Sequence, residues 1–235
     1  MIWDIDLQRV LIHGHTRFEL DVAFASDASR LVLYGPSGAG KTQTLKMMAG
    51  IARPDRGRAV VAGRTLYESA SGLSVSPQER RLAYVFQEYA LFPHLTVRQN
   101  IASGLRRGWL NPSRAFTDPA VERWIEAFHL GPVAGHYPHQ LSGGQRQRTA
   151  LARALVIDPK ALLLDEPFAA LDKSLRQRLR QELIELQERL RIPLLLITHD
   201  DDDLRVLAHE VIHVRAGRVV ASADTEESVL DGARA

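Results

Sequence analysis

Residues 30–49 read RLVLYGPSGAGKTQTLKMMA and contain three local signals in a fixed order. The apolar run Leu31–Tyr34 has the length and β-propensity of a buried strand. The following residues, Gly35–Thr42, match the pattern G-x-x-x-x-G-K-[ST], and Leu45, Met48 and Ala49 continue at helical spacing. Strand, glycine-rich loop and helix come in the order of a phosphate-binding loop. The alternative is an ordinary glycine-rich turn, which does not require the matching elements on both sides.

The chemistry of this loop predicts that the chain binds a nucleoside triphosphate. Glycines let successive backbone N–H groups converge on an anion, and the helix N-terminus adds a partial positive charge. The Lys41 ammonium can reach the β- and γ-phosphates, and the Thr42 hydroxyl can bind Mg²⁺. The nucleotide-binding residues expected in the loop are Gly35, Pro36, Ser37, Gly38, Ala39, Gly40, Lys41, Thr42 and Gln43.

The composition fits a globular protein. The chain has 235 residues, of which 45% are hydrophobic and 25% are charged, so a sizeable core can form. It has no cysteine, which excludes disulfides and thiolate metal sites. Its formal net charge of +2 is too small to indicate nucleic-acid binding by itself. The N-terminal sequence MIWDIDLQRV lacks the features of a signal peptide, and no apolar run has the length of a membrane span.

Hydrophobic patterns along the chain predict an α/β fold. Strands are expected at residues 3–11, 18–24, 31–34, 59–61, 80–86, 161–164, 194–198, 211–214 and 219–221, and a loop at 69–77. Prolines and short helical patterns between residues 87 and 140 predict an inserted helical subdomain. Leucines repeated from 175 to 190 indicate a long amphipathic helix. Its arginines Arg176, Arg178 and Arg180 are interpreted as solvated surface.

Two adjacent acids follow the apolar strand expected at residues 161–164. Asp165 and Glu166 stand at its carboxyl end, where α/β sheets place ligands. Asp165 suits the positioning of Mg²⁺, and Glu166 suits activation of the attacking water. Without the phosphate loop, a solvated pair of acids in a turn would be the better interpretation; with it, a catalytic role is favoured.

The sequence LSGGQ at residues 141–145 predicts a helix that begins there and runs through Arg153. Ser142 and Gln145 form a capping-box pattern, and the two glycines between them leave backbone N–H groups available to a phosphate. A bare helix cap would explain a lone S-G-G. The whole string LSGGQRQRTALARAL, between a phosphate loop and an LLLDEP strand, is far more specific.

The order GPSGAGKT, Gln87, LSGGQ, LLLDEP, Ala170-Leu171-Asp172 and His199 resembles the ATP-binding-cassette (ABC) ATPases over nearly the whole chain. The resemblance implies an α/β fold with a P-loop NTPase core, an N-terminal antiparallel β subdomain and a helical subdomain inserted at about residues 88–155. It also implies a single ATP-binding domain over residues 1–235, with no C-terminal regulatory domain, and ATP and Mg²⁺ as ligands.

Members of this family close head to tail as dimers around two nucleotides. The resemblance therefore implies that a second copy of the chain is a partner and that the LSGGQ helix contacts the nucleotide of that copy. The residues expected at this contact are Ser142, Gly143, Gly144 and Gln145, with Asp172 ordering the interface.

The resemblance also assigns residues to catalysis and to the metal. Gln87 is expected to contact Mg²⁺ and the attacking water, and His199 to hydrogen-bond the γ-phosphate. The expected catalytic residues are Glu166, His199 and Gln87, and the expected metal-binding residues are Thr42, Gln87 and Asp165. For His199 considered alone, a surface histidine would be the simpler interpretation, but its position after a buried strand, beyond the LLLDEP strand, favours a functional role.

Three features of the sequence leave questions open. Gln43 stands where the family usually has a small hydroxyl residue, although its backbone N–H can still bind phosphate. The adenine-stacking residue is one of His13, His15 and Phe18, and Phe18 equally suits the core. The run Asp200–Asp203 could bind a metal, but acids in the first turn of a helix are favoured by its dipole.

The absence of membrane spans implies that a transporter of this kind needs two separate transmembrane permease subunits. This chain would bind them peripherally, at the cytoplasmic face of the membrane. A solute-binding protein would be an indirect partner, and no nucleic acid is expected. Residues 80–97 resemble the ATPases of bacterial importers for small oxyanions, sugars and related solutes. The similarity is closest to molybdate importer ATPases, whose loop style is found at residues 63–69 and 73–81. The alternatives are importers for sulfate, sugar, polyamine or iron, and a soluble ABC ATPase acting on nucleic acid.

The segment Tyr89–Pro93 either receives a permease helix or packs the helical subdomain.

Overall fold

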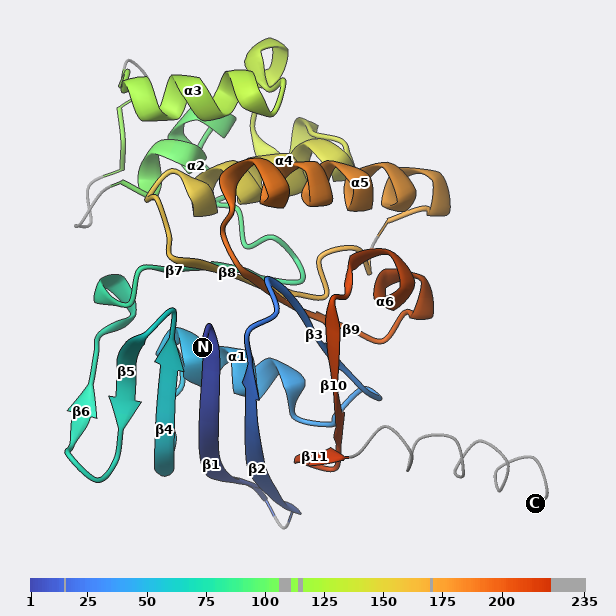
Figure 1. Ribbon diagram of the computed structural model, residues 1–235. Helices are drawn as coiled ribbons and strands as arrows, with labels where there is room; N and C mark the ends of the chain where they lie inside the picture. The colour runs from blue at the N-terminus through green and yellow to red at the C-terminus, as the bar shows by residue number, and fades with distance from the viewer. Residues whose placement is uncertain (15, 106–110, 114–115, 170, 221–235) are drawn as a thin grey trace. The chain divides into compact units, whose positions relative to one another are not determined.

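The computed structural model describes residues 1–14, 16–105, 111–113, 116–169 and 171–220. They group into two compact units: residues 1–80 with the described residues from 193 onward, and residues 81–192. Figure 1 labels the strands and helices of each unit. The phosphate loop belongs to the first unit, and the LSGGQ and LLLDEP segments belong to the second.

A mixed β-sheet forms the first unit, with the strand order β6-β5-β4-β1-β2-β11-β10-β3-β9. The strands from β6 to β2 pair antiparallel, whereas β10 pairs parallel with β3 and β3 with β9. This combination confirms the expected parallel core with an antiparallel β subdomain. The elements are β1 (Trp3–His13), β2 (Thr16–Ser26), β3 (Arg30–Tyr34), α1 (Lys41–Ala49), β4 (Arg56–Val61), β5 (Arg64–Glu68), β6 (Leu73–Ser74), a 3₁₀ turn (Pro77–Glu79), β9 (Leu194–Thr198), α6 (Asp201–Leu207), β10 (Glu210–Arg215) and β11 (Arg218–Val220).

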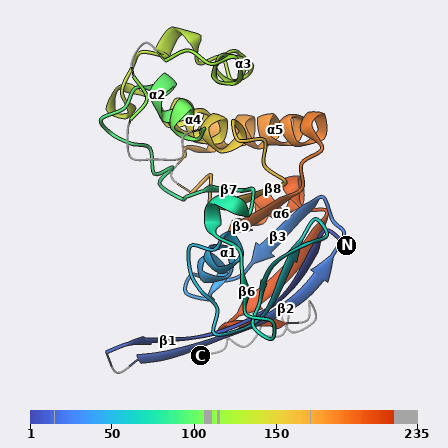
Figure 2. The same cartoon turned by 90° about the vertical axis from the view of Figure 1, so that its left-hand side faces the viewer.

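Strands β1 and β2 form a long hairpin, which Figure 2 shows from the side. Their pairing runs without a break from Trp3 opposite Ser26 to His13 opposite Thr16. Apolar residues alternate with polar ones on both strands, so one face of the hairpin is buried and the other meets solvent. The buried face carries Trp3, Ile5, Leu7, Leu20, Val22 and Phe24.

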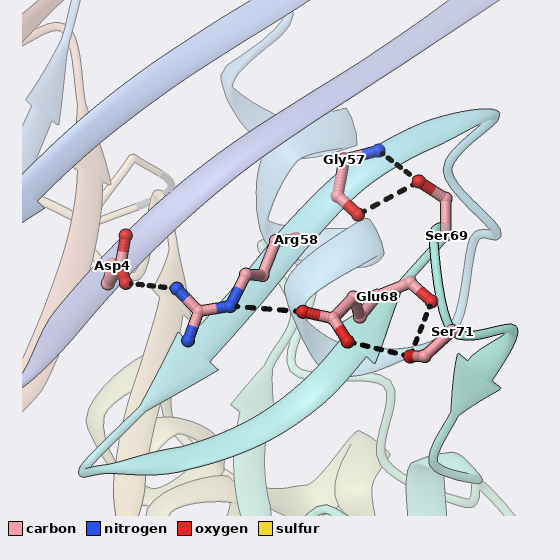
Figure 3. A network of polar contacts seen from close by, with 6 residues as sticks. All are labelled: Asp4, Gly57, Arg58, Glu68, Ser69 and Ser71. Carbon is pink, nitrogen blue, oxygen red and sulfur yellow. Dashed lines mark hydrogen bonds and ion pairs between the residues drawn. The ribbon is translucent and has the colours of Figure 1, made fainter.

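Polar contacts on the exposed side join β1, β4 and β5 (Figure 3). The Arg58 guanidinium lies 2.8 Å from a carboxylate oxygen of Asp4 and 3.4 Å from one of Glu68. The Ser69 hydroxyl donates to the carbonyl oxygen of Gly57 and accepts from its N–H. Because these groups are largely exposed, we expect each ion pair to contribute no more than about 1 kcal/mol to folding.

A buried arginine caps the C-terminal end of α1, the helix that follows the phosphate loop. The side chain of Arg80 is 2% exposed, and its guanidinium donates to the carbonyl oxygens of Met47 and Met48 at 2.8 and 2.7 Å. Burial lowers the pKa of Arg80, whereas the negative end of the helix dipole favours its charge. The helix is thereby fixed at the end opposite the loop.

The second unit combines two parallel strands with four α-helices among its described residues. Strand β7 pairs with β8 from Leu82 opposite Ala161 to Val85 opposite Leu164. Helix α4 packs against α2 and α3, which agrees with the helical segment that the sequence predicted. The elements are β7 (Leu82–Val85), α2 (Val97–Ser103), α3 (Pro119–Ala127), 3₁₀ turns at Gly131–Val133 and Pro138–Gln140, α4 (Gly143–Leu155), β8 (Ala161–Asp165) and α5 (Lys173–Leu190).

Two expectations from the sequence are wrong. Arg180 is not solvated surface but only 3% exposed, because the buried face of α5 is wider than its leucine stripe and takes in Arg180, Leu183 and Gln187 at helical spacing. The loop expected at residues 69–77 contains the short strand β6, which pairs with β5, a strand that the sequence did not predict. Strand β5 has only five residues, and its buried residues Leu66 and Tyr67 are adjacent instead of alternating, so no strand pattern marks it in the sequence.

Candidate functional site

The phosphate loop joins β3 to α1 and depends on glycines that lie against other strands. A Cβ on Gly35 would lie 2.0 Å from the carbonyl oxygen of Val214 on β10, so no larger residue fits there. Gly40 has φ 101°, a left-handed backbone that favours glycine. The loop therefore follows a path that is set by the backbone of the surrounding sheet.

Helix α1 begins without a side-chain cap. Its N-cap residue is Gly40, which has no side chain to accept a hydrogen bond, and its first turn contains no acid. Pro36, Ser37 and Gly38, in front of the helix, are exposed. An uncapped helix start next to exposed glycine-rich backbone suits an anion, because the first N–H groups of a helix point outward and carry partial positive charge. This geometry fits the phosphates of a nucleotide.

Lys41 folds back over the loop that precedes it. Its side chain is 4% exposed, and Nζ donates to the carbonyl oxygens of Gly35 and Pro36 at 2.6 and 2.9 Å. Thr42 and Gln43 follow as half-buried residues in the first turn of α1. The ammonium group of Lys41 thus lies over the backbone where the sequence predicts a phosphate.

The turn between β10 and β11 supports the loop from another side, and sequence reasoning did not assign it this role. The Gly217 N–H donates to the carbonyl oxygen of Ala39 at 3.0 Å, and the Gly217 carbonyl accepts from the Asp21 N–H at 2.7 Å. A Cβ on Gly217 would lie 2.0 Å from the carbonyl oxygen of Glu19. The only signal in the sequence was the turn pair Ala216-Gly217 itself, which carries no information about its distant partners.

Of the three candidates for adenine stacking, Phe18 lies against the loop. Its ring atoms Cε1 and Cζ are each 3.4 Å from the position of a Cβ on Gly40, and the side chain is half-buried. His13 is exposed at the far end of the β1–β2 hairpin. His15 lies outside the described residues. The geometry favours Phe18 for a contact with a nucleotide on this loop.

His199 follows β9, the strand next to β3. Tyr34 pairs with Thr198, so Gly35 and His199 each continue from the carboxyl end of neighbouring parallel strands. The structure therefore brings these two predicted residues to the same edge of the sheet. The His199 side chain is exposed there, as a contact with a ligand requires.

The four acids after His199 have separate local partners. Asp200 is the N-cap of α6 and accepts from the Asp202 N–H, and the buried Asp203 accepts from the Thr198 hydroxyl. Asp201 accepts from the Tyr34 hydroxyl at 2.6 Å, which together with burial raises the pKa of Tyr34 to about 12. Among the residues described, no group of three metal-binding side chains occurs. The helix-start interpretation of this run is confirmed.

In the second unit, Asp165 ends β8 as a buried carboxylate. It is 4% exposed, and its Oδ2 accepts a hydrogen bond of 2.8 Å from the Tyr84 hydroxyl on β7. Burial, the charge of Asp165 and this hydrogen bond together raise the pKa of Tyr84 well above its ordinary value. Glu166 comes next with φ 47°, a left-handed backbone that is uncommon for a residue with a side chain. Such strain is typical of functional sites.

Gln87 is exposed just beyond β7, and an arginine holds the segment that follows it. Tyr89 and Ala90 both have left-handed backbones, with φ 62° and 43°. Arg153 on α4 donates to their carbonyl oxygens at 2.7 and 2.8 Å, and its guanidinium lies 5.5 Å from the centre of the Phe92 ring. Burial lowers the pKa of Arg153. The helix that begins with the LSGGQ sequence therefore fixes the backbone after Gln87.

Helix α4 begins as the sequence predicts, and it extends to Leu155. The Ser142 hydroxyl accepts from the Gln145 N–H at 3.3 Å, and the Gln145 side chain accepts from the Ser142 N–H at 2.9 Å. Gly143 and Gly144 also allow close packing, because a Cβ on either would lie 3.1 Å from a leucine methyl, of Leu171 before α5 for Gly143 and of Leu175 in its first turn for Gly144. Ser142 itself is exposed.

Asp172 is the N-cap of α5. Its carboxylate accepts from the Leu175 N–H at 3.0 Å and from the Ser174 hydroxyl at 2.9 Å, and these bonds lower its pKa. The side chain is exposed, while Leu171 beside it is buried. Ala170, in the same motif, lies outside the described residues.

The residues predicted to bind Mg²⁺ have suitable chemistry. They offer a hydroxyl from Thr42, an amide oxygen from Gln87 and a carboxylate from the buried Asp165. Mg²⁺ prefers oxygen ligands, and in nucleotide sites it is held by few protein groups together with the phosphates. The donor set therefore fits this ion.

Comparison with known proteins gives consistent matches. The profile of the ABC transporter family matches residues 22–169. The molybdenum import ATP-binding protein ModC of Rhodospirillum rubrum is 40% identical over 230 residues, which are 95% of this chain and 58% of that protein. The sulfate/thiosulfate import ATP-binding protein CysA of Caulobacter vibrioides is 42% identical over 205 residues, 86% of this chain and 58% of that protein. This chain thus spans less than two thirds of the length of these relatives.

A solved structure supports the same assignment. The ATP-binding cassette MJ0796, in a dimeric post-hydrolysis state bound to ADP and Pi, matches with a TM-score of 0.75 and 26% identity, covering 94% of this chain and 97% of that one. In the part of the chain that the structure describes, none of the helices has both the length and the apolar character needed to cross a membrane.

Proposed function

The chain belongs to the ABC transporter family, and we propose that it is the ATP-hydrolysing subunit of an importer for a small oxyanion, with molybdate as the solute. The observation that carries the ATP-binding part of this proposal is the uncapped, glycine-led start of α1 with Lys41 folded over the loop in front of it. Both features suit a chain of phosphates. The names of the relatives ModC and CysA, which are import ATP-binding proteins, support the transport role.

The loop Gly35–Gln43 binds the phosphates of ATP. Lys41 exchanges its two carbonyl acceptors for β- and γ-phosphate oxygens, because an ammonium group binds a charged acceptor more strongly than a neutral one. The first backbone N–H groups of α1 donate to the same phosphates. The Phe18 ring beside Gly40 offers its face to the adenine base.

The Thr42 hydroxyl, the Gln87 amide oxygen and the Asp165 carboxylate hold Mg²⁺, which neutralises charge on the phosphate oxygens when it is bound. Glu166 orients the attacking water and accepts its proton, and His199 donates a hydrogen bond to the γ-phosphate. Gln87 helps to position the same water. The catalytic group is therefore Glu166 with Gln87 and His199.

A second copy of the chain completes the site. Ser142, Gly143, Gly144 and Gln145 of one copy contact the γ-phosphate bound to the other, and Asp172 orders the interface between them. The exposure of Ser142 and of Asp172 is compatible with such a contact. The dimeric state named for the matched cassette MJ0796 gives further support.

The dimer of ATP-hydrolysing subunits binds peripherally to two separate permease subunits at the cytoplasmic face of the membrane. A solute-binding protein delivers the solute to those permease subunits. The helical segment of about residues 88–155, inserted within one ATP-binding domain, carries the docking surface. Its residues Tyr89–Pro93 receive a permease helix, since Phe92 is 44% exposed while Arg153 holds the backbone carbonyls of Tyr89 and Ala90. Closure of the dimer around ATP then moves the permease.

Replacing Glu166 with glutamine tests the enzymatic part of the proposal. We expect Glu166→Gln to lower the rate of ATP hydrolysis by about 10²-fold or more, because the general base is lost, while ATP affinity stays within a factor of about two. The purified variant with Mg·ATP should also form a stable dimer, measured by light scattering. Hydrolysis at the unchanged rate, or a chain that stays monomeric when saturated with ATP, would refute the proposal.

Uptake assays test the choice of solute. In a deletion strain complemented with this chain, we expect uptake of labelled molybdate to recover, with unlabelled sulfate competing poorly. Complementation with the Glu166→Gln chain is the control and should restore no uptake. Recovery of sulfate uptake alone would transfer the assignment to sulfate and leave the ATPase part intact.

A further inference from the structure

The Tyr84 hydroxyl lies at one of the predicted metal ligands, and no role for it followed from the sequence. Its oxygen is 2.8 Å from Oδ2 of Asp165. The pairing of β7 with β8 explains this contact: Tyr84 stands opposite Leu163, so its side chain shares a face with Leu163 and with Asp165 two residues further on. A tyrosine is long enough to reach such a diagonal neighbour.

The position of the Tyr84 ring is itself fixed. The ring of Phe86, two residues along the same strand, lies 4.5 Å from it between centroids. On the opposite face of β7, Ala83 and Val85 are 2% and 1% exposed, which anchors the strand. The fixed ring keeps the hydroxyl at hydrogen-bond distance from the Asp165 carboxylate.

We propose that Tyr84 is a positioning residue for the metal site: its hydroxyl holds the Asp165 carboxylate in the orientation that binds Mg²⁺. The inference rests on the proposed function, since it takes Asp165 as a ligand of that ion. Carboxylates that bind metals are themselves held by hydrogen bonds in many proteins, and loss of such an outer partner typically lowers metal affinity 10- to 100-fold.

The test replaces Tyr84 with phenylalanine and uses Mn²⁺ as a spectroscopic probe in place of Mg²⁺. In the Glu166→Gln background, where ATP is preserved, the dissociation constant of Mn²⁺ in the complex with ATP is measured by electron paramagnetic resonance. We expect Tyr84→Phe to raise this constant about 10-fold. The affinity for ATP in EDTA should stay within a factor of about two, because the hydroxyl acts on the metal ligand and not on the phosphate loop.

Tyr67→Phe is the matched control, since it removes a tyrosine hydroxyl that donates to the carbonyl oxygen of Pro54. It should leave the Mn²⁺ constant unchanged. A double-mutant cycle locates the effect: in an Asp165→Asn chain, adding Tyr84→Phe should weaken Mn²⁺ binding no further. A merely structural role for Tyr84 would not produce this dependence on Asp165.

The outcomes separate the two proposals. Normal ATP binding by Tyr84→Phe with an unchanged Mn²⁺ constant overturns the role of Tyr84 and leaves the proposed function standing. A full 10-fold effect that persists in the Asp165→Asn background also overturns it. Failure of the unsubstituted chain to bind ATP in EDTA overturns the proposed function, and the role of Tyr84 with it.

Discussion

Helices α1 and α4 both begin at glycines that we expect to face phosphate, yet their first turns are completed in different ways. At α1 the N-cap is Gly40, with a left-handed backbone and no side chain to accept a hydrogen bond. At α4 the N-cap is Ser142, and its hydroxyl and the Gln145 side chain form a full capping box. One helix start depends on an outside acceptor, and the other supplies its own.

This difference suits different tasks. The first N–H groups of an uncapped helix gain most from a bound anion, so α1 is built to hold a phosphate continuously. A capped helix is stable with or without a ligand, so α4 can approach a nucleotide and leave it without losing its structure. Under the proposed function, we expect α1 to hold the phosphates of ATP and α4 of the second copy to make the reversible contact.

Alanine at one glycine of each segment should give the largest difference. Gly35→Ala would place a Cβ 2.0 Å from the carbonyl oxygen of Val214, a backbone atom that cannot move aside, whereas Gly143→Ala meets a leucine methyl at 3.1 Å. We expect Gly35→Ala to lower the free energy of unfolding by about 3 kcal/mol or more, and Gly143→Ala to change it by less than about 1 kcal/mol. Urea unfolding measures both. Equal losses would show that the two segments are equally constrained.

Inorganic phosphate should distinguish the two helix starts directly. At about 100 times its dissociation constant, phosphate should stabilise the unsubstituted chain by about 2.7 kcal/mol, and Lys41→Ala should lose most of this gain. Ser142→Ala is the counterpart: we expect it to lower the basal stability by about 1 kcal/mol through loss of the cap while keeping the phosphate effect. Thermal unfolding with and without phosphate measures the shifts. If Ser142→Ala lost the stabilisation by phosphate and Lys41→Ala kept it, the phosphate would bind at the start of α4 and not at that of α1.

The smallest expected effect concerns a third helix start, whose cap carries a charge. Hydrogen bonds from Leu175 and Ser174 lower the pKa of Asp172, so its contribution to stability is present above the ordinary value near 3.8 and is lost as the pH falls through the lowered value. Asp172→Asn keeps an acceptor without the charge. Its stability deficit should therefore be largest near neutral pH and decline only as the pH falls below about 3.8, whereas that of Ser142→Ala should not vary between pH 3 and 6. A constant deficit for Asp172→Asn would contradict this account.

The predictions from the sequence were strongest where local chemistry decides the structure. A capping box depends on residues three apart, so Ser142 and Gln145 sufficed to place the start of α4. The run of acids after His199 was identified as a helix start for the same reason. The α/β core also followed from local patterns, because buried parallel strands are short apolar runs. The ABC family itself was evident from motif order alone.

Contacts between residues far apart in the chain were decided only by the tertiary structure. Gly217 supports the phosphate loop, Tyr84 reaches Asp165, and Arg180 is buried although Arg178 and Gln181 close to it are exposed. None of these is visible in the sequence, because hydrophobic periodicity reports which face of an element is buried but not which element covers it. Strand register and packing supply that information. They determine which side chains from distant parts of the sequence lie within hydrogen-bond distance of one another.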